Sequence, residues 1–323
     1  MSNSAVMTMR DSFIGTLCDR MASDHSIFFL AADLGAPALD RLRDQFPDRF
    51  INVGIAEQNL INVAAGLALE GFSVYSYAIA PFITMRAYEQ ARVNLAISSQ
   101  VRPVNVTMIG LGGGVSYQVS GPTHHCLEDL AIMRLLPNMS VYSPSDPVVA
   151  AKLVDHTLTT VGPKYIRFDG KALPALHADP SAIDLKRGFA PLAQGSDICL
   201  VSTGFMSHRA LKVAQARPGV AVLDLFSLKP CDEAALAQAL APYRHVVTME
   251  EAFINNGGLD SLVTKVAREH TLSCALHPVG VSDRYVFDLG SRDQLHALNG
   301  MDDAAVVALV DRLINLTDRL RAA

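Results

Sequence analysis

Short apolar runs, separated by stretches of helical periodicity, are the feature that most limits how this chain can fold. The run Ile27–Ala31 (IFFLA) contains no polar residue, so a strand formed there must be buried on both faces. Such strands are typical of parallel sheets that carry helices on both sides. Residues 1–170 are therefore predicted to form a doubly wound α/β domain. Its other strands are expected at 72–77, 104–109, 140–143 and Lys164–Phe168, with helices at 7–20, 57–67, 82–90 and 126–135.

A second alternating pattern follows residues 171–195, a stretch rich in Pro, Ala and polar residues that reads as a linker. Helices between successive strands predict a smaller doubly wound α/β domain over residues 196–323. The expected fold class is thus α/β with two doubly wound domains. Strands of the second domain are expected at 197–202, 220–226, 245–249 and 275–279, and a long helix at 302–319 closes the chain.

Composition argues against several classes of function. The net charge is −5 and no basic stripe is present, so a nucleic-acid partner is not expected. No apolar run approaches the roughly 20 residues of a membrane helix, and the amino terminus lacks a signal pattern. The five cysteines form no CxxC pair and no metal-spaced set. Reduced thiols, a cytoplasmic location, no membrane contact and no metal ligand on this chain are therefore expected.

Glu57 is the most informative single acid. It follows a turn-prone segment and stands in the first turn of a predicted helix whose other residues are largely apolar. One interpretation is that the carboxylate complements the positive end of the helix dipole. The other is that an acid in a poorly hydrated place takes part in acid–base chemistry.

Two further candidates follow predicted strands. Asp33 comes just past Ile27–Ala31, and α/β sheets build their sites at the carboxyl ends of strands. A turn or a helix cap is the alternative for Asp33. The glycine-rich segment 110–122 must turn tightly or approach something closely, but it lacks the Lys-Ser/Thr pair of a phosphate-binding loop. His124 follows this segment, which is a better place for a functional histidine than an ordinary core or surface position.

Four strings resemble the transketolase family of thiamine-diphosphate enzymes. They are GIAEQN at 54–59, RAYEQ at 86–90, GPTH at 121–124, and PNM with PSD between 137 and 146. The resemblance covers nearly the whole chain, but only the carboxy-terminal half of a full transketolase. It implies that Glu57 activates the cofactor by a hydrogen bond to its pyrimidine ring, and that His124 faces the substrate.

The resemblance also implies further cofactor contacts. Asp33 lies in an ADL string that the family places near the cofactor, and aromatic rings of a following segment pack on the pyrimidine. The chain departs from the family here, because Ile79 stands where the first aromatic ring is expected and only Phe82 matches the second. Pyrimidine packing is therefore expected from Ile79 and Phe82 together. The alternative for Phe82 is an ordinary place in the core.

Substrate contacts implied by the resemblance are Arg10 and Arg167, whose planar guanidinium groups suit a phosphate. Solvent-facing helix or ion-pair positions are the alternative for both arginines. Ser120 is a second departure, because transketolases carry there an aspartate that helps to recognise a substrate hydroxyl. Ser120 and the glycines before it are expected to make this wall of the pocket roomier or more mobile, with altered sugar recognition as the consequence.

The family's diphosphate and magnesium motif, GDG…N, is absent from the sequence. A partner alpha subunit is therefore expected to hold Mg²⁺ and the thiamine diphosphate moiety, in an alpha2beta2 assembly with a small-molecule sugar as substrate. The favoured function is the beta subunit of a split transketolase, which moves a two-carbon ketol unit between a ketose donor and an aldose acceptor. The alternatives are a deoxyxylulose-phosphate synthase-like enzyme, a 2-oxo acid dehydrogenase beta subunit, and a non-enzymatic partner that keeps the fold.

Overall fold

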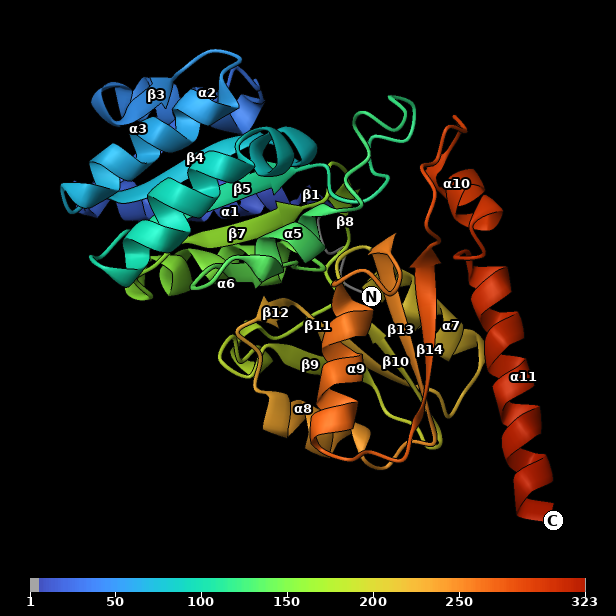
Figure 1. The fold of residues 1–323 in the computed structure, drawn as a ribbon. Coiled ribbons are helices and arrows are strands. Elements are labelled where there is room, and N and C mark those ends of the chain that lie inside the picture. Colours follow the sequence, from blue (N-terminus) through green and yellow to red (C-terminus); the bar gives the residue numbers. More distant parts are fainter. Residues whose placement is uncertain (1–5, 323) are drawn as a thin grey trace.

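The computed structural model describes residues 6–322 and confirms the α/β class, with two sheets flanked by helices (Figure 1). The larger sheet has seven strands in the order β12-β6-β7-β5-β4-β2-β3, all parallel except β12. Its strands are β2 (Ile27–Ala31), β3 (Phe50–Asn52), β4 (Ser73–Ile79), β5 (Val106–Leu111), β6 (Ser140–Tyr142), β7 (Lys164–Phe168) and β12 (Ser227–Lys229).

Helices cover both faces of this sheet, as continuous apolar strands require. One face packs against residues of α1 (Met9–Ser23), α2 (Pro37–Gln45) and α6 (Pro147–Thr159). The other packs against α3 (Glu57–Leu69), the helical stretch 82–100 and α5 (Asp129–Leu135). The stretch 82–100 is divided into η2 (Phe82–Arg86), α4 (Tyr88–Gln90), η3 (Ala91–Ile97) and η4 (Ser98–Gln100).

The smaller sheet has five strands in the order β14-β13-β10-β11-β9, with β9 antiparallel to its neighbour. They are β9 (Phe189–Ala193), β10 (Ile198–Ser202), β11 (Ala221–Leu225), β13 (His245–Phe253) and β14 (Ala275–Val281). One face packs against α7 (Met206–Ala216) and α11 (Asp303–Ala322), the other against α8 (Glu233–Leu240) and α9 (Leu259–Glu269). The remaining elements are β1 (Met7–Thr8), η1 (Pro47–Arg49), β8 (Ala172–Leu173), η5 (Pro180–Ala182) and α10 (Arg292–Leu298).

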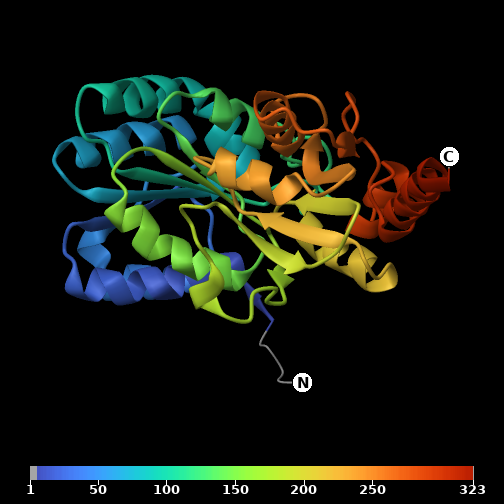
Figure 2. The ribbon, with the colours of Figure 1, turned by 90° about the horizontal axis from the view of Figure 1, so that it is seen from below.

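The two domains lie side by side and share elements (Figure 2). Strand β12 comes from the second half of the chain but joins the edge of the larger sheet. The segment 171–195 is partly folded, because β8 pairs with β1 and β9 pairs with β11. One apolar cluster runs from α3 of the first domain to α8 and α9 of the second. The boundaries 1–170 and 196–323 stay a prediction, and residues 1–5 lie outside the described part.

Two helices begin later than the sequence pattern indicates, and both differences have a local cause. Helix α1 starts at Met9 because Met7 and Thr8 pair with β8, and the Thr8 side chain then caps the helix. Helix α5 starts at Asp129 instead of 126 because the backbone of Cys126 pairs with Gly114. This pairing holds the chain extended just after His124.

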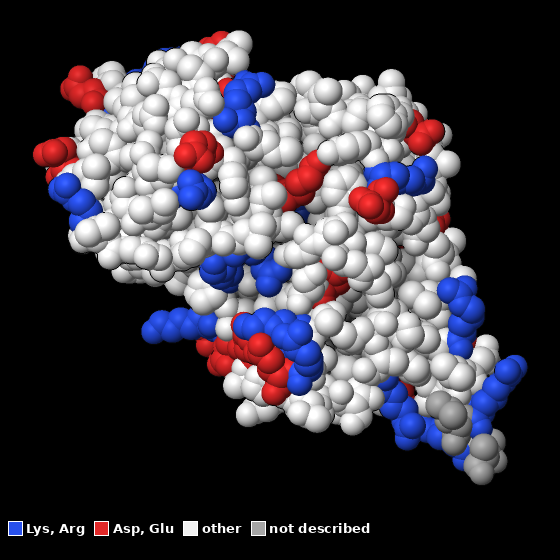
Figure 3. Space-filling model, viewed as in Figure 1, with Lys and Arg blue, Asp and Glu red and all other residues white. Residues whose placement is uncertain are grey.

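Acidic and basic side chains are interspersed with wide neutral areas on the face shown in Figure 3. Within the described residues 6–322, no helix is long and apolar enough to cross a membrane.

Candidate active site

Glu57 is the first residue of α3 and is only 2% exposed. The helix starts there because positive-φ Gly54 and a tight turn redirect the chain after β3. Its Oε2 atom accepts a charge-assisted hydrogen bond from Nη1 of Arg86 at 2.5 Å. The Arg86 side chain is 46% exposed, so this ion pair joins a buried carboxylate to an arginine at the surface.

An aromatic ring and an imidazole continue from this ion pair. The guanidinium carbon of Arg86 lies 4.6 Å from the centroid of the Phe82 ring. The Phe82 ring in turn meets the His124 ring edge to face, with 5.3 Å between centroids. The structure therefore brings together three predicted residues, Glu57, Phe82 and His124, and adds Arg86. We call these four residues the Glu57 cluster.

Arg86 is the member of the Glu57 cluster that the sequence pattern did not assign. It lies four residues after Phe82 in the helical stretch 82–100, and side chains at that spacing share a helix face. The spacing was therefore an available signal. The RAYEQ string that contains Arg86 supports the family resemblance, but by itself it gives this arginine no role.

The two other predicted cofactor residues lie at strand ends. Asp33 is exposed, has a φ of 50° and follows β2. Its Oδ1 accepts from Nδ2 of Asn52 at 3.1 Å, and Oδ1 of Asn52 accepts from the Gly54 amide at 2.9 Å. Asp33 thus supports the turn that leads into Glu57. Ile79 is the last residue of β4, half-buried and three positions before Phe82. Their contact with a cofactor stays a prediction.

Arg10 and Ser120 lie apart from the hydrogen bonds and ring contacts of the Glu57 cluster. The Nε of Arg10 donates to Oδ1 of Asp11 at 2.7 Å within α1. Ser120 is exposed and its amide donates to the Tyr117 carbonyl at 3.0 Å, in a turn before His124. The contacts of Arg10 and Ser120 with substrate stay a prediction.

Arg167 lies in β7 and is only 6% exposed. Its Nη2 donates to the main-chain oxygens of Cys126 and Glu251, each at 2.7 Å. Its Nε lies 3.2 Å from Oδ2 of buried Asp129. The structure therefore places Arg167 at the junction of the two domains, and its assignment as a phosphate ligand stays a prediction.

The glycine-rich segment is closely packed, and the expectation of a spacious wall is wrong at the glycines themselves. Gly112, Gly113 and Gly114 are buried. A Cβ atom would overlap the Tyr117 ring at Gly112 and the Arg167 side chain at Gly113. At Gly114 it would overlap the Glu251 side chain. The missing side chains are needed for close approach, so they leave no empty space.

The carboxy-terminal domain reaches the edge of the Glu57 cluster. Tyr285 and Phe287, between β14 and α10, line an open groove together with Phe82, Arg86 and Glu128. Burial raises the pKa of the Glu128 carboxyl group. The sequence assigned no chemistry to this domain, because nothing local in a sequence shows that residues so far apart in the chain meet.

The Glu57 cluster suits a flat nitrogen heterocycle. A buried carboxylate can accept an N–H from such a ring, while the neighbouring Phe82 offers an aromatic face for stacking. Within residues 6–322, no three His, Cys, Asp or Glu side chains lie close enough together to bind a metal ion.

Comparison with known proteins agrees with this arrangement. Residues 5–174 match the family described as "Transketolase, pyrimidine binding domain", and residues 190–306 match "Transketolase, C-terminal domain". One of the subunits of an apulose-4-phosphate transketolase from Actinobacillus succinogenes is 37% identical over 274 residues, which cover 82% of this chain and 85% of the relative. A 6-deoxy-6-sulfo-D-fructose transketolase subunit of Clostridium sp. is 32% identical over 305 residues, 93% of this chain and 92% of the relative.

Solved structures give the same relationship. A split gene transketolase, described as an inactive beta4 tetramer, superposes with a TM-score of 0.85 at 32% identity, over 96% of this chain and 99% of the other. A transketolase from Campylobacter jejuni shares the fold at a TM-score of 0.78 and 19% identity, and this chain covers 47% of it. The chain therefore belongs to the transketolase family and corresponds to the pyrimidine-binding and carboxy-terminal domains of a full-length member.

Proposed function

We propose that this chain is the beta subunit of a split transketolase that moves a two-carbon ketol unit from a ketose donor to an aldose acceptor. Membership of the family implies dependence on thiamine diphosphate. The observation that carries the proposal is the buried Glu57 carboxylate, which is linked through Arg86 to the Phe82 ring and from there to His124. Relatives that match this chain over most of both lengths are transketolase subunits, which supports the same conclusion.

Each residue of the Glu57 cluster has a role in this proposal. Thiamine diphosphate supplies a carbon nucleophile and an electron sink for cleavage and formation of the ketol carbon–carbon bond. Glu57 holds a hydrogen bond to a pyrimidine nitrogen, and Phe82 with Ile79 packs against that ring. His124 exchanges a proton with a substrate hydroxyl or carbonyl oxygen at the edge of the Phe82 ring. Asp33 supports the turn that carries Glu57.

The partner is an alpha subunit that carries the diphosphate and Mg²⁺ site, in an alpha2beta2 assembly in the cytoplasm. Two observations support it: the sequence lacks the family's GDG…N motif, and the similar beta4 tetramer is described as inactive. The chain also covers about half of the single-chain transketolases whose fold it shares.

The substrate in this proposal is an anionic ketose outside the common pentose phosphates. The two similar subunits are named for apulose 4-phosphate and 6-deoxy-6-sulfofructose, which carry a phosphate and a sulfonate. Arg10 would bind such an anion, and Ser120 would meet a hydroxyl at the site's rim. Arg167 already contacts Cys126, Asp129 and Glu251 within the protein.

A second candidate is a deoxyxylulose-phosphate synthase-like condensation, because such a synthase of Myxococcus xanthus is 33% identical over 304 residues. One experiment separates the two. The chain is combined with its alpha subunit, thiamine diphosphate and Mg²⁺, and given either a ketose phosphate with an aldose or pyruvate with glyceraldehyde 3-phosphate. Ketol transfer without CO₂ release is expected, whereas CO₂ release from pyruvate would replace the first candidate with the second.

A further inference from the structure

We propose that Arg167 is a positioning residue that ties the carboxy-terminal domain to the segment carrying His124. The inference rests on the role proposed for His124. It gives the carboxy-terminal domain a part in the reaction, although that domain contributes no member of the Glu57 cluster.

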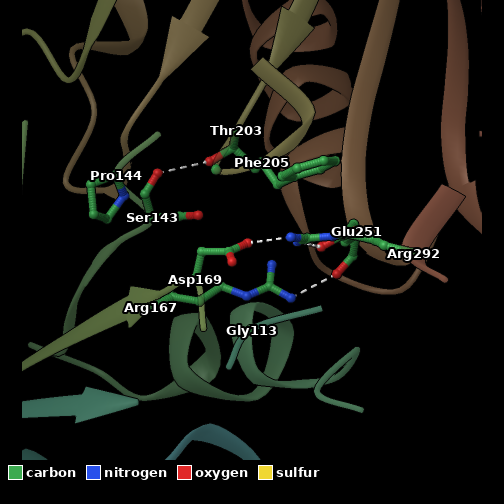
Figure 4. A pocket seen from close by; sticks show the side chains of 10 residues that line it. Gly113, Ser143, Pro144, Arg167, Asp169, Thr203, Phe205, Glu251 and Arg292 are labelled. Atoms are coloured by element: carbon green, nitrogen blue, oxygen red, sulfur yellow. Dashed lines mark hydrogen bonds and ion pairs between the residues drawn. The ribbon is translucent and has the colours of Figure 1, made fainter. Parts of the chain in front are cut away.

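Arg167 makes one contact on each side of the domain junction with the same nitrogen atom. Its Nη2 donates to the main-chain oxygen of Cys126 in the first domain and of Glu251 in the second, both at 2.7 Å. Figure 4 shows the guanidinium of Arg167 directed at Glu251, beside the small cavity that both residues line. Both acceptors are main-chain oxygens, so these two hydrogen bonds hold the backbone at Cys126 and the backbone at Glu251 in a fixed relative position.

On the first domain, the bond to Cys126 acts close to His124. Cys126 is two residues further along the chain, and its backbone pairs with Gly114 through hydrogen bonds of 2.8 and 3.0 Å. The amides of His124 and His125 both donate to the Gly121 carbonyl, at 3.0 and 3.1 Å. This short, hydrogen-bonded segment has little freedom to absorb a shift at Cys126, so such a shift would move the His124 ring against Phe82.

On the second domain, Glu251 is itself fixed. Its carboxylate accepts from Nε of Arg292 at 2.7 Å and also from Arg292 Nη2 and from His296. Arg292 reaches back to Asp169 of the first domain, with Nη1 2.6 Å from Oδ2. Glu251 therefore offers Arg167 a rigid support. We call Arg167, Glu251, Arg292, Asp169 and His296 the junction cluster.

The charge of Arg167 is already balanced inside the protein. Its Nε faces Asp129, whose Oδ2 also accepts from the Tyr165 hydroxyl at 2.6 Å. Gly113 and Gly114 pack directly against the Arg167 and Glu251 side chains, where any Cβ would overlap them. A buried guanidinium that faces a carboxylate and donates to two main-chain oxygens is suited to holding the backbone in place.

The test compares three variants within the assembled enzyme. Arg167→Met removes the bonds and keeps most of the side-chain volume, and Arg167→Lys keeps the charge with a single donor group. Arg134→Met is the matched control, because Arg134 of α5 also crosses the junction, donating to the main-chain oxygens of Gly257 and Gly258. It bonds no residue between Gly114 and Cys126.

Arg167→Met is expected to lower kcat about tenfold to a hundredfold, since an error near 1 Å in a reacting group costs up to roughly 10² in rate. KM should change less than about threefold, because substrate binding is not what is lost. Hydrogen exchange of the His125 and Cys126 amides should speed up in Arg167→Met, and Arg167→Lys should restore part of kcat. Arg134→Met should lower the melting temperature and leave kcat within about twofold.

Three results would overturn the inference. A selective rise in KM for phosphorylated donors, with kcat intact, would make Arg167 a phosphate ligand. Equal kcat losses in Arg167→Met and Arg134→Met would reduce its role to domain attachment. Unchanged exchange of the two amides would show that Arg167 does not hold the segment. A separate His124→Asn variant with full activity would defeat the role of His124, while the exchange experiment would still decide whether Arg167 is an anchor.

Discussion

Glu57 and Glu251 are both buried carboxylates paired with arginine, yet their surroundings differ. Glu57 is 2% exposed and has one ionic partner, Arg86, which is half in solvent. Glu251 is 4% exposed and has two partners, Arg292 and His296, both enclosed by protein. The first carboxylate keeps unused hydrogen-bonding capacity next to an open groove, whereas the second is satisfied on all sides.

This difference supports the proposed role of Glu57 in catalysis and indicates a structural role for Glu251. Burial by itself would raise the pKa of Glu251, but the charges and hydrogen bonds of Arg292 and His296 outweigh it and hold that pKa well below its usual range. Such an acid stays ionised and cannot exchange a proton near neutral pH. Of these two carboxylates, Glu57 is the one whose ionic partner reaches the surface.

The largest expected effect is on stability and comes from the junction cluster. Glu251→Ala leaves Arg292 buried with Asp169 as its remaining counter-charge, and breaking a buried ion pair in this way costs about 3–5 kcal/mol. Urea unfolding of the chain at neutral pH measures this loss. A change below about 1 kcal/mol would show that the junction cluster does not stabilise the fold.

Glu57→Gln is expected to lower the reaction rate strongly and to change the stability little, unlike Glu251→Ala. The change keeps the shape but removes most of the driving force for proton transfer, so the rate of the complex with the alpha subunit should fall about a hundredfold or more. Stability should change by no more than about 1 kcal/mol, because the partner Arg86 is half-exposed and such pairs contribute little. Near-normal turnover in the assembled enzyme would remove Glu57 from the mechanism.

A third prediction is about how the stability of the protein changes at low pH. The folded-state pKa of Glu251 is depressed, so its contribution to stability is fully present above the unfolded pKa of about 4.3 and is lost as pH falls through the folded value. Wild-type protein should therefore lose stability steeply below about pH 5. The difference in unfolding free energy between pH 7 and about pH 3 should be smaller for Glu251→Gln, and equal acid sensitivity of both proteins would contradict this expectation.

The smallest expected effect lies at the rim of the Glu57 cluster. Ser120→Asp restores the acid found in transketolases and should improve kcat/KM with common aldose phosphates by about tenfold, the value of one good charge-assisted hydrogen bond. Because Ser120 is exposed, stability should not change. Wild type that already uses xylulose 5-phosphate and ribose 5-phosphate at rates typical of central metabolism would make Ser120 a neutral variation.

The sequence predicted the parts of the fold that local pattern controls. The strands Ile27–Ala31 and Lys164–Phe168 have the predicted bounds, because continuous apolar character marks a buried strand. The start of α5 was wrong by three residues, since the cause is the pairing of Cys126 with Gly114, a non-local contact. The shared strand β12 had no local signal for the same reason.

In the candidate site, too, local sequence pattern predicted some residues and could not predict contacts between distant parts of the chain. Glu57 and His124 stood out because each follows a turn or glycine segment and lies within a recognisable string. The glycines of 112–114 were predicted either to turn tightly or to approach something closely, and the structure shows a close approach whose partners, Arg167 and Glu251, come from distant strands. Sequence pattern can show that a backbone must be approached closely, but it cannot show which side chain approaches it.

We propose that this chain forms an active site only together with an alpha subunit. The direct measurement is the rate of ketol transfer at a fixed amount of this chain, with thiamine diphosphate and Mg²⁺ in excess, as alpha subunit is added. We predict no turnover by either subunit alone and a rate that rises to a plateau at one alpha per beta. Turnover by the isolated chain, or tight cofactor binding to it by calorimetry, would contradict the account.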